Sequence, residues 1–518
     1  MKKLFLFLSI LSLISLSPLT SSAIKGDGTE GTPFIITTQE ELYLISDFPD
    51  CNFELGNDIS LEGEWTPLCT YSDDFTGKFN GNGYTISNLQ VSNFINSGLF
   101  SINNGIIKNL NIQTSEIGIT SNNILENNIG IITGINNGSI LGCNVNGVIN
   151  YTNTLHGEKN KDFHYNAYLG GICGKNTGKI EKINANILSK DIIAYFYEYH
   201  SAPSYIATAN SYSYKGQGII YFGGVTGINS GTITNCAITT DVTISETHYA
   251  NVGGVCGENA GKIEKTIANN NLNITKSHNC SHMGGISGYD NNDSYIYTCK
   301  SIGQLNSDNG YSGGISGISN GKIDFSYFIG TLSGYYIGGI AIGNNVNIDS
   351  CYSASTGGTY DMNSGIGCNS DSVVTNSYYD QTTSGATDTG YGLPKSTLAM
   401  KMKRTYINWD FDTIWGIDEN INNGYPYLLC EYTPIEHQII FDIETLTAEL
   451  YAKNTGIYTI IFADYESNQF IKSDIQSLHL KQGYNTVSTN LVLGNSDKIF
   501  LWNNLEKLIP TCEAFTVE

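Results

Sequence analysis

Short apolar runs recur along the chain, and glycine and asparagine interrupt each of them. The clearest copy is Gly223-Gly-Val-Thr-Gly-Ile-Asn-Ser-Gly-Thr-Ile233. Copies of it start at Gly170, Gly253 and Gly313, and less regular ones near Gly98, Gly130, Gly284, Gly338 and Gly365. The apolar residues are mostly β-branched and show no helical period, which is typical of short strands. The pattern therefore predicts a stack of similar strand-and-turn units.

The apolar residue after each Asn-x-Gly turn defines the repeat. These residues are Ile107, Ile140, Ile180, Ile233, Ile263, Ile296, Ile323, Ile348 and Val374. Most lie roughly 25 to 33 residues apart, with two longer intervals of about 40 and 53, which suits one coil of a β-solenoid. A second apolar row is Ile132, Ile172, Val225, Val255, Ile286, Ile315 and Ile340. In stacked coils each row should form a ladder through the interior. At the turn, we expect the asparagine to adopt a positive φ and the glycine to leave room.

The repeat Gly-Gly-Val-x-Gly-x-Asn-x-Gly-x-Ile-x-Asn-Cys, as it stands from Gly223 to Cys236, resembles the GLUG motif of bacterial secreted and surface proteins. The resemblance covers roughly residues 24–432. It implies a right-handed parallel β-helix. The family that carries this motif includes haemagglutinin-like adhesins and the non-catalytic portions of some large secreted peptidases. Such a family defines an architecture more than an activity.

The two ends of the repeat region have their own signals. Residues 1–23 combine a positive start, a short apolar core and small residues before Ala23, as a secretory signal peptide does. We expect cleavage after Ala23 and no membrane-spanning segment in the mature chain. Residues 24–97 should cap the β-helix, with a capping box at Thr38-Gln-Glu-Glu41 that begins a short helix. Coils should fill 98–380.

The C-terminal part changes character twice. Residues 381–433 should form a C-terminal cap, in which the aromatic cluster around Trp409, Trp415 and Tyr425 closes the last coil; a ligand cleft is the alternative. Residues 435–518 contain alternating apolar strands and predict a small antiparallel β-sandwich. The predicted fold class is thus all-β, a parallel β-helix followed by a sandwich.

Charge and composition limit the partners. The chain has 26 basic and 48 acidic residues, a formal charge of −22, and Arg404 is its one arginine. Nucleic acid is therefore disfavoured, because phosphate binding needs clustered lysine and arginine. Few charges and many asparagine, serine, threonine and tyrosine residues suggest an outward face of hydroxyls and amides. A host surface protein or a glycan is the expected partner.

Twelve cysteines in a secreted chain would normally indicate disulfides. Here Cys143, Cys236, Cys299 and Cys351 occupy one repeat position on alternate units, and Cys173 and Cys256 share another. Alternate coils lie roughly 9–10 Å apart, farther than a disulfide spans. We therefore predict buried thiols at these positions. Cys51 and Cys69 are the one pair that could form a bridge.

Two long insertions interrupt the coils, at 151–168 and 187–222. The second is rich in tyrosine, a side chain that can stack on a sugar or a protein surface. Its candidate binding residues are Tyr195, Tyr197, Tyr199, Tyr205, Tyr212 and Tyr214. Alternatively, Tyr195, Tyr197 and Tyr199 are alternating residues of an extra strand.

Candidate chemistry is sparse. His278, Cys280 and His282 would share one face of a strand and could hold zinc, although incidental surface histidines explain them as well. No zinc-peptidase, nucleophile-elbow, P-loop or dinucleotide motif is present. The sequence names no cofactor. Its first interpretation is a non-catalytic, adhesin-like surface protein; a polysaccharide lyase or hydrolase on the same fold and a structural spacer remain alternatives.

Overall fold

The structure is a computed structural model. It describes residues 24–516 except for 72, 122–125, 157–163, 190–191, 198–216, 246, 248, 278, 309, 344, 358–362, 368–371, 387–390, 433–438, 443–445, 453–455, 467–468, 481–482, 494–496, 505–508 and 511–514. The predicted signal peptide lies outside the described residues. None of the helices in the described part has the length and apolar character needed to cross a membrane.

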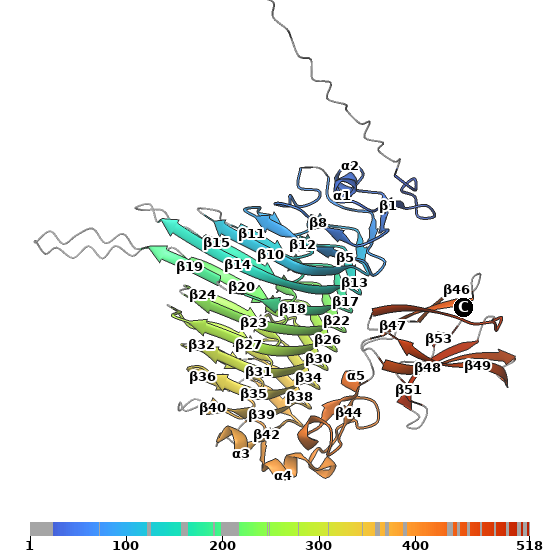
Figure 1. The fold of residues 1–518 in the computed structure, drawn as a ribbon. Coiled ribbons are helices and arrows are strands. Elements are labelled where there is room, and N and C mark those ends of the chain that lie inside the picture. The colour runs from blue at the N-terminus through green and yellow to red at the C-terminus, as the bar shows by residue number, and fades with distance from the viewer. Residues whose placement is uncertain are drawn as a thin grey trace, which may run out of the picture.

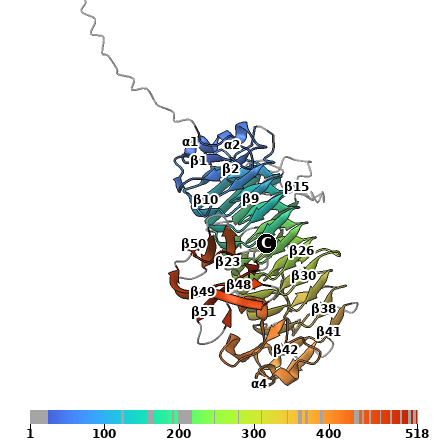
Figure 2. The ribbon, with the colours of Figure 1, turned by 90° about the vertical axis from the view of Figure 1, so that its right-hand side faces the viewer.

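The chain winds into a β-helix, as the repeat predicts, and its coils form four parallel sheets, which we name A to D (Figure 1). The chain passes from sheet D to sheet C, then to sheets A and B, and returns to sheet D one layer further along. Strands of sheet C such as β16 (Cys173–Asn176) and β21 (Thr226–Asn229) have 4 residues, because glycine and asparagine end their apolar runs, whereas β14 (Asn144–His156) of sheet B has 13. Figure 2 shows the layers from the side.

The strands of the four sheets have the following bounds. Sheet A contains β1 (Phe34–Ile36), β2 (Asn52–Leu55), β4 (Lys78–Asn80), β9 (Ile106–Lys108), β13 (Ser139–Leu141), β17 (Lys179–Glu181), β22 (Thr232–Thr234), β26 (Lys262–Glu264), β30 (Tyr295–Tyr297), β34 (Lys322–Asp324), β38 (Asn347–Asp349) and β41 (Val373–Thr375). Sheet B contains β3 (Ile59–Ser60), β5 (Thr85–Ser87), β6 (Gln90–Ser92), β10 (Asn111–Ser121), β14 (Asn144–His156), β18 (Asn184–Leu188), β19 (Ile192–Tyr197), β23 (Ala237–Ser245), β27 (Ile267–Thr275), β31 (Lys300–Ser307), β35 (Tyr327–Ser333), β39 (Tyr352–Thr356), β42 (Tyr378–Asp380) and β43 (Leu393–Lys395). Sheet C contains β8 (Phe100–Asn103), β12 (Thr133–Asn136), β16 (Cys173–Asn176), β21 (Thr226–Asn229), β25 (Cys256–Asn259), β29 (Ser287–Asp290), β33 (Ser316–Ser319) and β37 (Ala341–Ile342). Sheet D contains β7 (Asn96–Ser97), β11 (Glu126–Gly130), β15 (His164–Gly170), β20 (Gln217–Gly223), β24 (Tyr249–Gly253), β28 (Ser281–Gly284), β32 (Gly310–Gly313), β36 (Tyr336–Gly338) and β40 (Asn363–Ser364).

The predicted isoleucine ladder runs through the interior of sheet A. Ile180 pairs with Ile140 on one side and Ile233 on the other, and the series continues to Ile348 and Val374. The isoleucines of this ladder are fully buried, as are those of the second row around Val225. Like residues therefore stack on like residues, so each coil buries its apolar face only by packing on its neighbours.

The Asn-x-Gly turn works differently from the prediction. The first asparagine of the turn has no positive φ; it points inward and forms a buried ladder along sheet C. The amide Nδ2 of Asn176 donates to Oδ1 of Asn229 at 2.8 Å, and Asn229 donates to Asn259 at 2.9 Å. The left-handed corner lies instead two residues after each ladder isoleucine, at residues such as Asn235 and Lys265. The asparagine is thus selected by hydrogen bonding between coils, which local turn chemistry does not reveal.

Both ends of the β-helix are closed by the chain itself. At the N-terminal end, Thr38 and Glu41 form the predicted capping box of α1 (Gln39–Leu42), which is followed by α2 (Leu44–Asp47). At the other end, α3 (Gln381–Ser384) follows β42, β43 is the last strand of sheet B, and Ala386 packs on the interior core.

The aromatic cluster of the C-terminal cap does not close the last coil as expected. Trp409, Trp415 and Tyr425 pack on the outward face of sheet B, against a ladder of Tyr327, Tyr352 and Tyr378. This cluster is separate from the interior core. Around it lie α4 (Thr397–Met400), the short helices Lys403–Thr405 and Asn422–Gly424, β44 (Trp415–Gly416), β45 (Tyr427–Leu428) and α5 (Leu429–Tyr432). The cap thus packs on the side of the last coils and buries the three outward tyrosines of sheet B.

Two antiparallel sheets form the C-terminal domain and share one apolar core, which makes it a β-sandwich. One sheet contains β46 (Ile439–Asp442), β47 (Thr447–Ala452) and β50 (Gly483–Ser488). The other contains β48 (Gly456–Glu466), β49 (Gln469–Leu480), β51 (Lys498–Asn504), β52 (Ile509–Pro510) and β53 (Phe515–Thr516). Figure 1 shows this domain on the side of the stack opposite sheet D.

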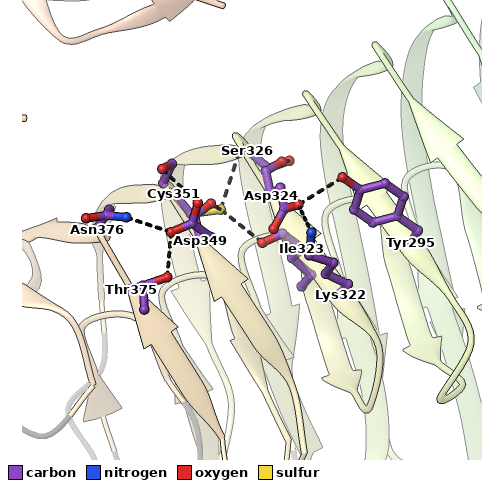
Figure 3. Close-up of polar contacts among 10 residues, drawn as sticks. Tyr295, Lys322, Ile323, Asp324, Ser326, Asp349, Cys351, Thr375 and Asn376 are labelled. Atoms are coloured by element: carbon purple, nitrogen blue, oxygen red, sulfur yellow. Dashed lines mark hydrogen bonds and ion pairs between the residues drawn. The ribbon is translucent and has the colours of Figure 1, made fainter. Parts of the chain in front are cut away.

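The cysteines carry thiols in the described part of the chain. The six ladder cysteines are fully buried, and Thr226 lies between Cys173 and Cys256 in the register of sheet C. Figure 3 shows a typical site: the backbone N–H of Ser326 donates to Sγ of Cys351 at 3.4 Å, and the same sulfur lies 3.6 Å from the carbonyl oxygen of Ile323. These sulfurs occupy space between coils as small apolar groups.

The suggested Cys51–Cys69 bridge is absent. Cys69 Sγ faces the carbonyl oxygen of Ile45 at 3.8 Å, and Cys51 Sγ faces Oδ1 of its neighbour Asp50 at 3.8 Å. Each sulfur thus has a different neighbour, and Cys69 sits in a left-handed turn. Cys51 and Cys69 therefore carry thiols, as the ladder cysteines do.

The burial of the ladder thiols predicts their reactivity. Burial raises the pKa of both Cys143 and Cys173 to about 12, so neither forms thiolate at neutral pH. In the folded, unreduced protein we expect iodoacetamide to label exposed Cys280 first and the ladder cysteines not at all. After denaturation without reductant, intact-mass analysis should show labels at the ladder cysteines too. A denatured protein that takes up few labels would contradict the thiol assignment.

Candidate functional site

One row of outward side chains on sheet D is rich in aromatic rings. In register along the stack, the row consists of Asn128, Tyr168, Tyr221, Asn251, His282, Tyr311 and Tyr336. The next residue on most of these strands, for example Leu169 or Phe222, points into the core. Alternation along each strand therefore forces the row outward.

The rings of this row stack on each other along the axis of the β-helix. The centroids of Tyr168 and Tyr221 lie 4.9 Å apart, and those of Tyr311 and Tyr336 lie 4.6 Å apart, in both cases with nearly parallel planes. His282 contacts Tyr311 edge-on at 5.4 Å. These separations match the spacing of neighbouring strands, so the stacking follows from the register.

Sheet C supplies the other wall of this surface. Tyr289 of β29 stacks on His282 at 5.6 Å, and Nζ of Lys175 in β16 lies 4.2 Å above the ring of Tyr168. Contacts between outward side chains of two sheets require the sheets to meet at an angle that is concave on the outside. We call this surface the aromatic groove; it comprises Tyr168, Tyr221, Tyr249, Glu258, His282, Tyr289, Tyr311 and Tyr336.

The aromatic groove is interrupted by a notch at Asn251. There the row carries a short amide between Tyr221 and His282, which are therefore two strand spacings apart, roughly 9–10 Å. The notch has a volume of about 420 Å³ and is lined by Ile219, Tyr221, Tyr249, Asn251, Glu258, Asn279 and Tyr289. It is a recess open to solvent, large enough for a small organic group.

The polar groups of the notch are largely fixed by one another. The ring nitrogen Nδ1 of His282 lies 2.6 Å from the hydroxyl of Tyr249 and 2.9 Å from Oδ1 of Asn251. Burial lowers the pKa of His282 to about 4, so its ring is neutral at pH 7. Burial also raises the pKa of the tyrosines at positions 221 and 249, which therefore remain protonated.

Glu258 is the carboxylate of the notch. Its Oε1 accepts a hydrogen bond of 2.8 Å from Nδ2 of Asn291. Burial raises its pKa, and the bond from Asn291 opposes that shift in part. Among the residues that the structure describes, no lysine, arginine or histidine forms an ion pair with Glu258. The notch thus holds a half-buried carboxyl group beside three tyrosines.

A second recess lies on the outward face of sheet B, with a volume of about 380 Å³. Its lining includes a ladder of amides: Asn144 donates to Asn111 at 2.7 Å and Asn184 donates to Asn144 at 3.0 Å. The remaining amide and threonine groups, such as Thr239 and Asn269, present donors and acceptors to solvent. Such a surface suits a ligand rich in hydroxyl groups.

Two of the binding residues predicted from the sequence lie on sheet B, away from the aromatic groove. Tyr195 and Tyr197 belong to β19, an extra strand that pairs with β14 in parallel, as one of the two interpretations has it. The other four, Tyr199, Tyr205, Tyr212 and Tyr214, lie outside the described residues. The sequence did contain a signal for the aromatic groove: most of its sheet D residues stand two positions before a Gly-Gly pair, as in Tyr221-Phe-Gly-Gly224.

The suggested metal ligands are brought together only in part. Cys280 is exposed, whereas His282 is buried among Tyr249, Tyr289 and Tyr311, and His278 lies outside the described residues. Within the described part of the chain, no three histidine, cysteine or acidic side chains form a metal-binding group. His282 instead serves the aromatic groove, a role that the sequence interpretation missed.

Comparison with known proteins gives short matches. No family model matches the chain. The chain is 47% identical over 60 residues to a protein of Evansella cellulosilytica named "Putative Gly-rich membrane protein", covering 11% of this chain and 7% of that protein. It is 28% identical over 149 residues to halomucin of Haloquadratum walsbyi, covering 26% of this chain and 2% of halomucin. The chain therefore spans a small fraction of either relative.

One solved structure also matches. It is described as "a putative immunoglobulin A1 protease from Bacteroides ovatus", with 16% sequence identity and a TM-score of 0.28. The alignment covers 78% of this chain and 94% of the other.

Proposed function

We propose that this protein is a secreted or cell-surface β-helix that binds an extracellular partner without catalysis, in the manner of an adhesin. The observation that carries the proposal is the aromatic groove, a line of tyrosines held on the outside of a rigid scaffold. Large aromatic side chains outside the core are costly to solvate and are typical of binding surfaces. The names of the two relatives, "Putative Gly-rich membrane protein" and "Halomucin", support a surface location.

A glycan is the partner that fits these outward faces best. Tyrosine rings offer apolar faces and hydroxyl tips to sugar rings, and the amide recess of sheet B offers donors and acceptors to sugar hydroxyls. The net charge of −22 disfavours strongly acidic polymers, because like charges repel. A neutral or amine-bearing glycan is therefore the expected class.

The groove also supports the non-catalytic side of the proposal. Glycoside hydrolysis uses two carboxyl groups across the scissile bond. Among the described residues that line the notch, Glu258 is the one carboxyl group. Near the groove, the carboxylate of Glu126 forms an ion pair of 2.7 Å with Lys175, which lowers the pKa of Glu126. A paired and ionised Glu126 is a poor general acid.

A binding screen on immobilised glycans and matrix proteins tests the proposal. We expect the protein to bind a neutral or amine-bearing glycan and the double variant Tyr311→Ser/Tyr336→Ser to lose at least tenfold in affinity. Tyr297→Ser is the matched control, because Tyr297 also faces outward but lies on sheet A. Equal loss in both variants, or release of new reducing ends from the glycan, would contradict the proposal.

A second variant tests the tyrosine-rich insertion. The deletion must spare β20, whose residues Gln217–Gly223 belong to sheet D. We therefore expect a chain lacking residues 198–216 to fold normally and to retain binding through the aromatic groove. Complete loss of binding in this variant, with an unchanged melting temperature, would move the contact to the insertion. Binding by neither protein would favour the structural spacer.

A further inference from the structure

The notch at Asn251 has the composition of a site for an organic cation. Tyr221, Tyr249 and Tyr289 line it together with the carboxylate of Glu258. Aromatic faces attract ammonium groups within about 6 Å of a ring centroid, and several rings around one cation form an aromatic cage. The row of rings leaves room at this level, because Asn251 carries a short amide between Tyr221 and His282.

The same groove already holds an ammonium group elsewhere. Two coils before Glu258 in the register of sheet C stands Lys175, whose Nζ lies 4.2 Å from the ring of Tyr168 and 2.7 Å from Oε1 of Glu126. An aromatic ring and a carboxylate thus bind the protein's own ammonium at that level. An aromatic wall and a carboxylate recur at the notch. There, however, the residues in register with Lys175 on the next two coils are Ile228 and Glu258, so the protein supplies no ammonium group from this position.

Charge supports a cation more than a neutral ring. A half-buried carboxylate is destabilised unless a positive charge or several hydrogen bonds compensate it. Glu258 accepts a hydrogen bond from Asn291 and forms no ion pair among the described residues. An incoming ammonium would supply the missing charge, and the overall charge of −22 would attract it.

We propose that the notch at Asn251 is a binding site for an organic ammonium group, with Tyr221, Tyr249 and Tyr289 as its aromatic walls and Glu258 as its counter-charge. The proposal goes beyond glycan binding and does not depend on it. The ammonium could belong to a choline-type headgroup or to a lysine side chain, which share this chemistry. The first carries methyl groups that fill a recess of about 420 Å³ more completely.

Calorimetric titration of the purified protein tests the site. The probes are choline, its neutral isostere 3,3-dimethyl-1-butanol, and Nα-acetyl-lysine methylamide, all at one ionic strength. We expect at least one of the two ammonium probes to bind, and the neutral isostere to bind at least tenfold more weakly than choline if choline is the ligand. The stronger ammonium probe identifies the source. Binding of neither ammonium probe, or equal binding of choline and its isostere, would overturn the proposal.

Two variants locate the binding. Glu258→Gln keeps an acceptor for Asn291 and removes the charge, so ammonium affinity should fall at least tenfold; Tyr289→Leu should weaken it by removing one wall. Glu126→Gln is the matched control, because its carboxylate is already paired with Lys175. Unchanged affinity in Glu258→Gln, with the same melting temperature as the parent, would overturn the site. If the parent protein binds choline but binds no glycan, the proposed function is overturned and the ammonium site is not.

Discussion

Replacing Gly231 by alanine is expected to destabilise the protein by about 3 kcal/mol or more, close to the largest effect of any single added methyl group. A Cβ at this position would lie 2.0 Å from the carbonyl oxygen of Gly178, the equivalent residue of the preceding coil. Backbone cannot move aside as a side chain can, so the two coils must separate locally. Separation would also stretch the asparagine ladder, since the bond from Asn176 to Asn229 spans the same two coils.

Thermal unfolding followed by circular dichroism measures this effect. Gly118→Ala is the matched control, because a Cβ at Gly118 meets nothing within 4 Å and its φ is not left-handed. We expect the control to melt at or slightly above the parent temperature. If Gly231→Ala melts like the control, the coils are not stacked as closely as the structure has them.

Replacing Asp290 by asparagine should have a large effect of opposite sign. Asp290 occupies the next position of the buried asparagine ladder, in register with Asn259. It is fully buried, and neither carboxylate oxygen has a hydrogen-bond partner of good geometry in the structure. Four neutral side chains surround it, those of Asn259, Ser287, Ser316 and Ser319, and they offset the burial only in part. Burial therefore raises the pKa of Asp290 from 3.8 to about 6.

The direction of the pH dependence follows from that shift. Below about pH 4 the carboxyl group is protonated in both the folded and the unfolded chain, so it costs nothing. Between about pH 4 and pH 6 only the folded chain holds the proton, so the free energy of unfolding falls as pH rises. Above about pH 6 the loss is complete and amounts to about 3 kcal/mol. Asp290→Asn removes it and lets an amide continue the ladder.

Denaturation at two pH values tests this prediction. We expect Asp290→Asn to be more stable than the parent at pH 7 by up to about 3 kcal/mol and nearly equal to it at pH 4. Asp293→Asn is the control, because Asp293 is exposed in the adjacent turn. A variant that gains nothing at pH 7, or gains equally at both pH values, would show that Asp290 is not an ionised ladder residue.

The interior of the protein could be predicted because the repeated apolar residues are the ones that face it. Ile180, Ile233 and Ile263 stand at equal places in their units, and stacking brings equal places together. The thiol prediction followed from the same periodicity. The turn was misinterpreted because the amide of Asn229 bonds to other coils, and a single repeat contains no information on its neighbours.

The outward surface was harder to predict for a related reason. The tyrosines at 168, 221 and 311 come from units of unequal length, so their alignment depends on register rather than on sequence separation. Tyrosines are densest along the sequence in the insertion at 187–222, which favoured that segment as the binding surface. Likewise, the sequence placed Trp409 and Trp415 over the end of the last coil, but their contact with the outward tyrosines of sheet B depends on a ladder between coils.

A crystal structure determined from crystals of the protein grown with tetramethylammonium would test the central claim most directly. The claim is that in-register coils place Tyr221, Asn251 and His282 side by side on the outside of sheet D. The account predicts these three residues on neighbouring strands, with the cation in the gap above Asn251 and beside Glu258. A slip of one residue in this register would turn Tyr221 into the core and remove both the aromatic groove and the notch.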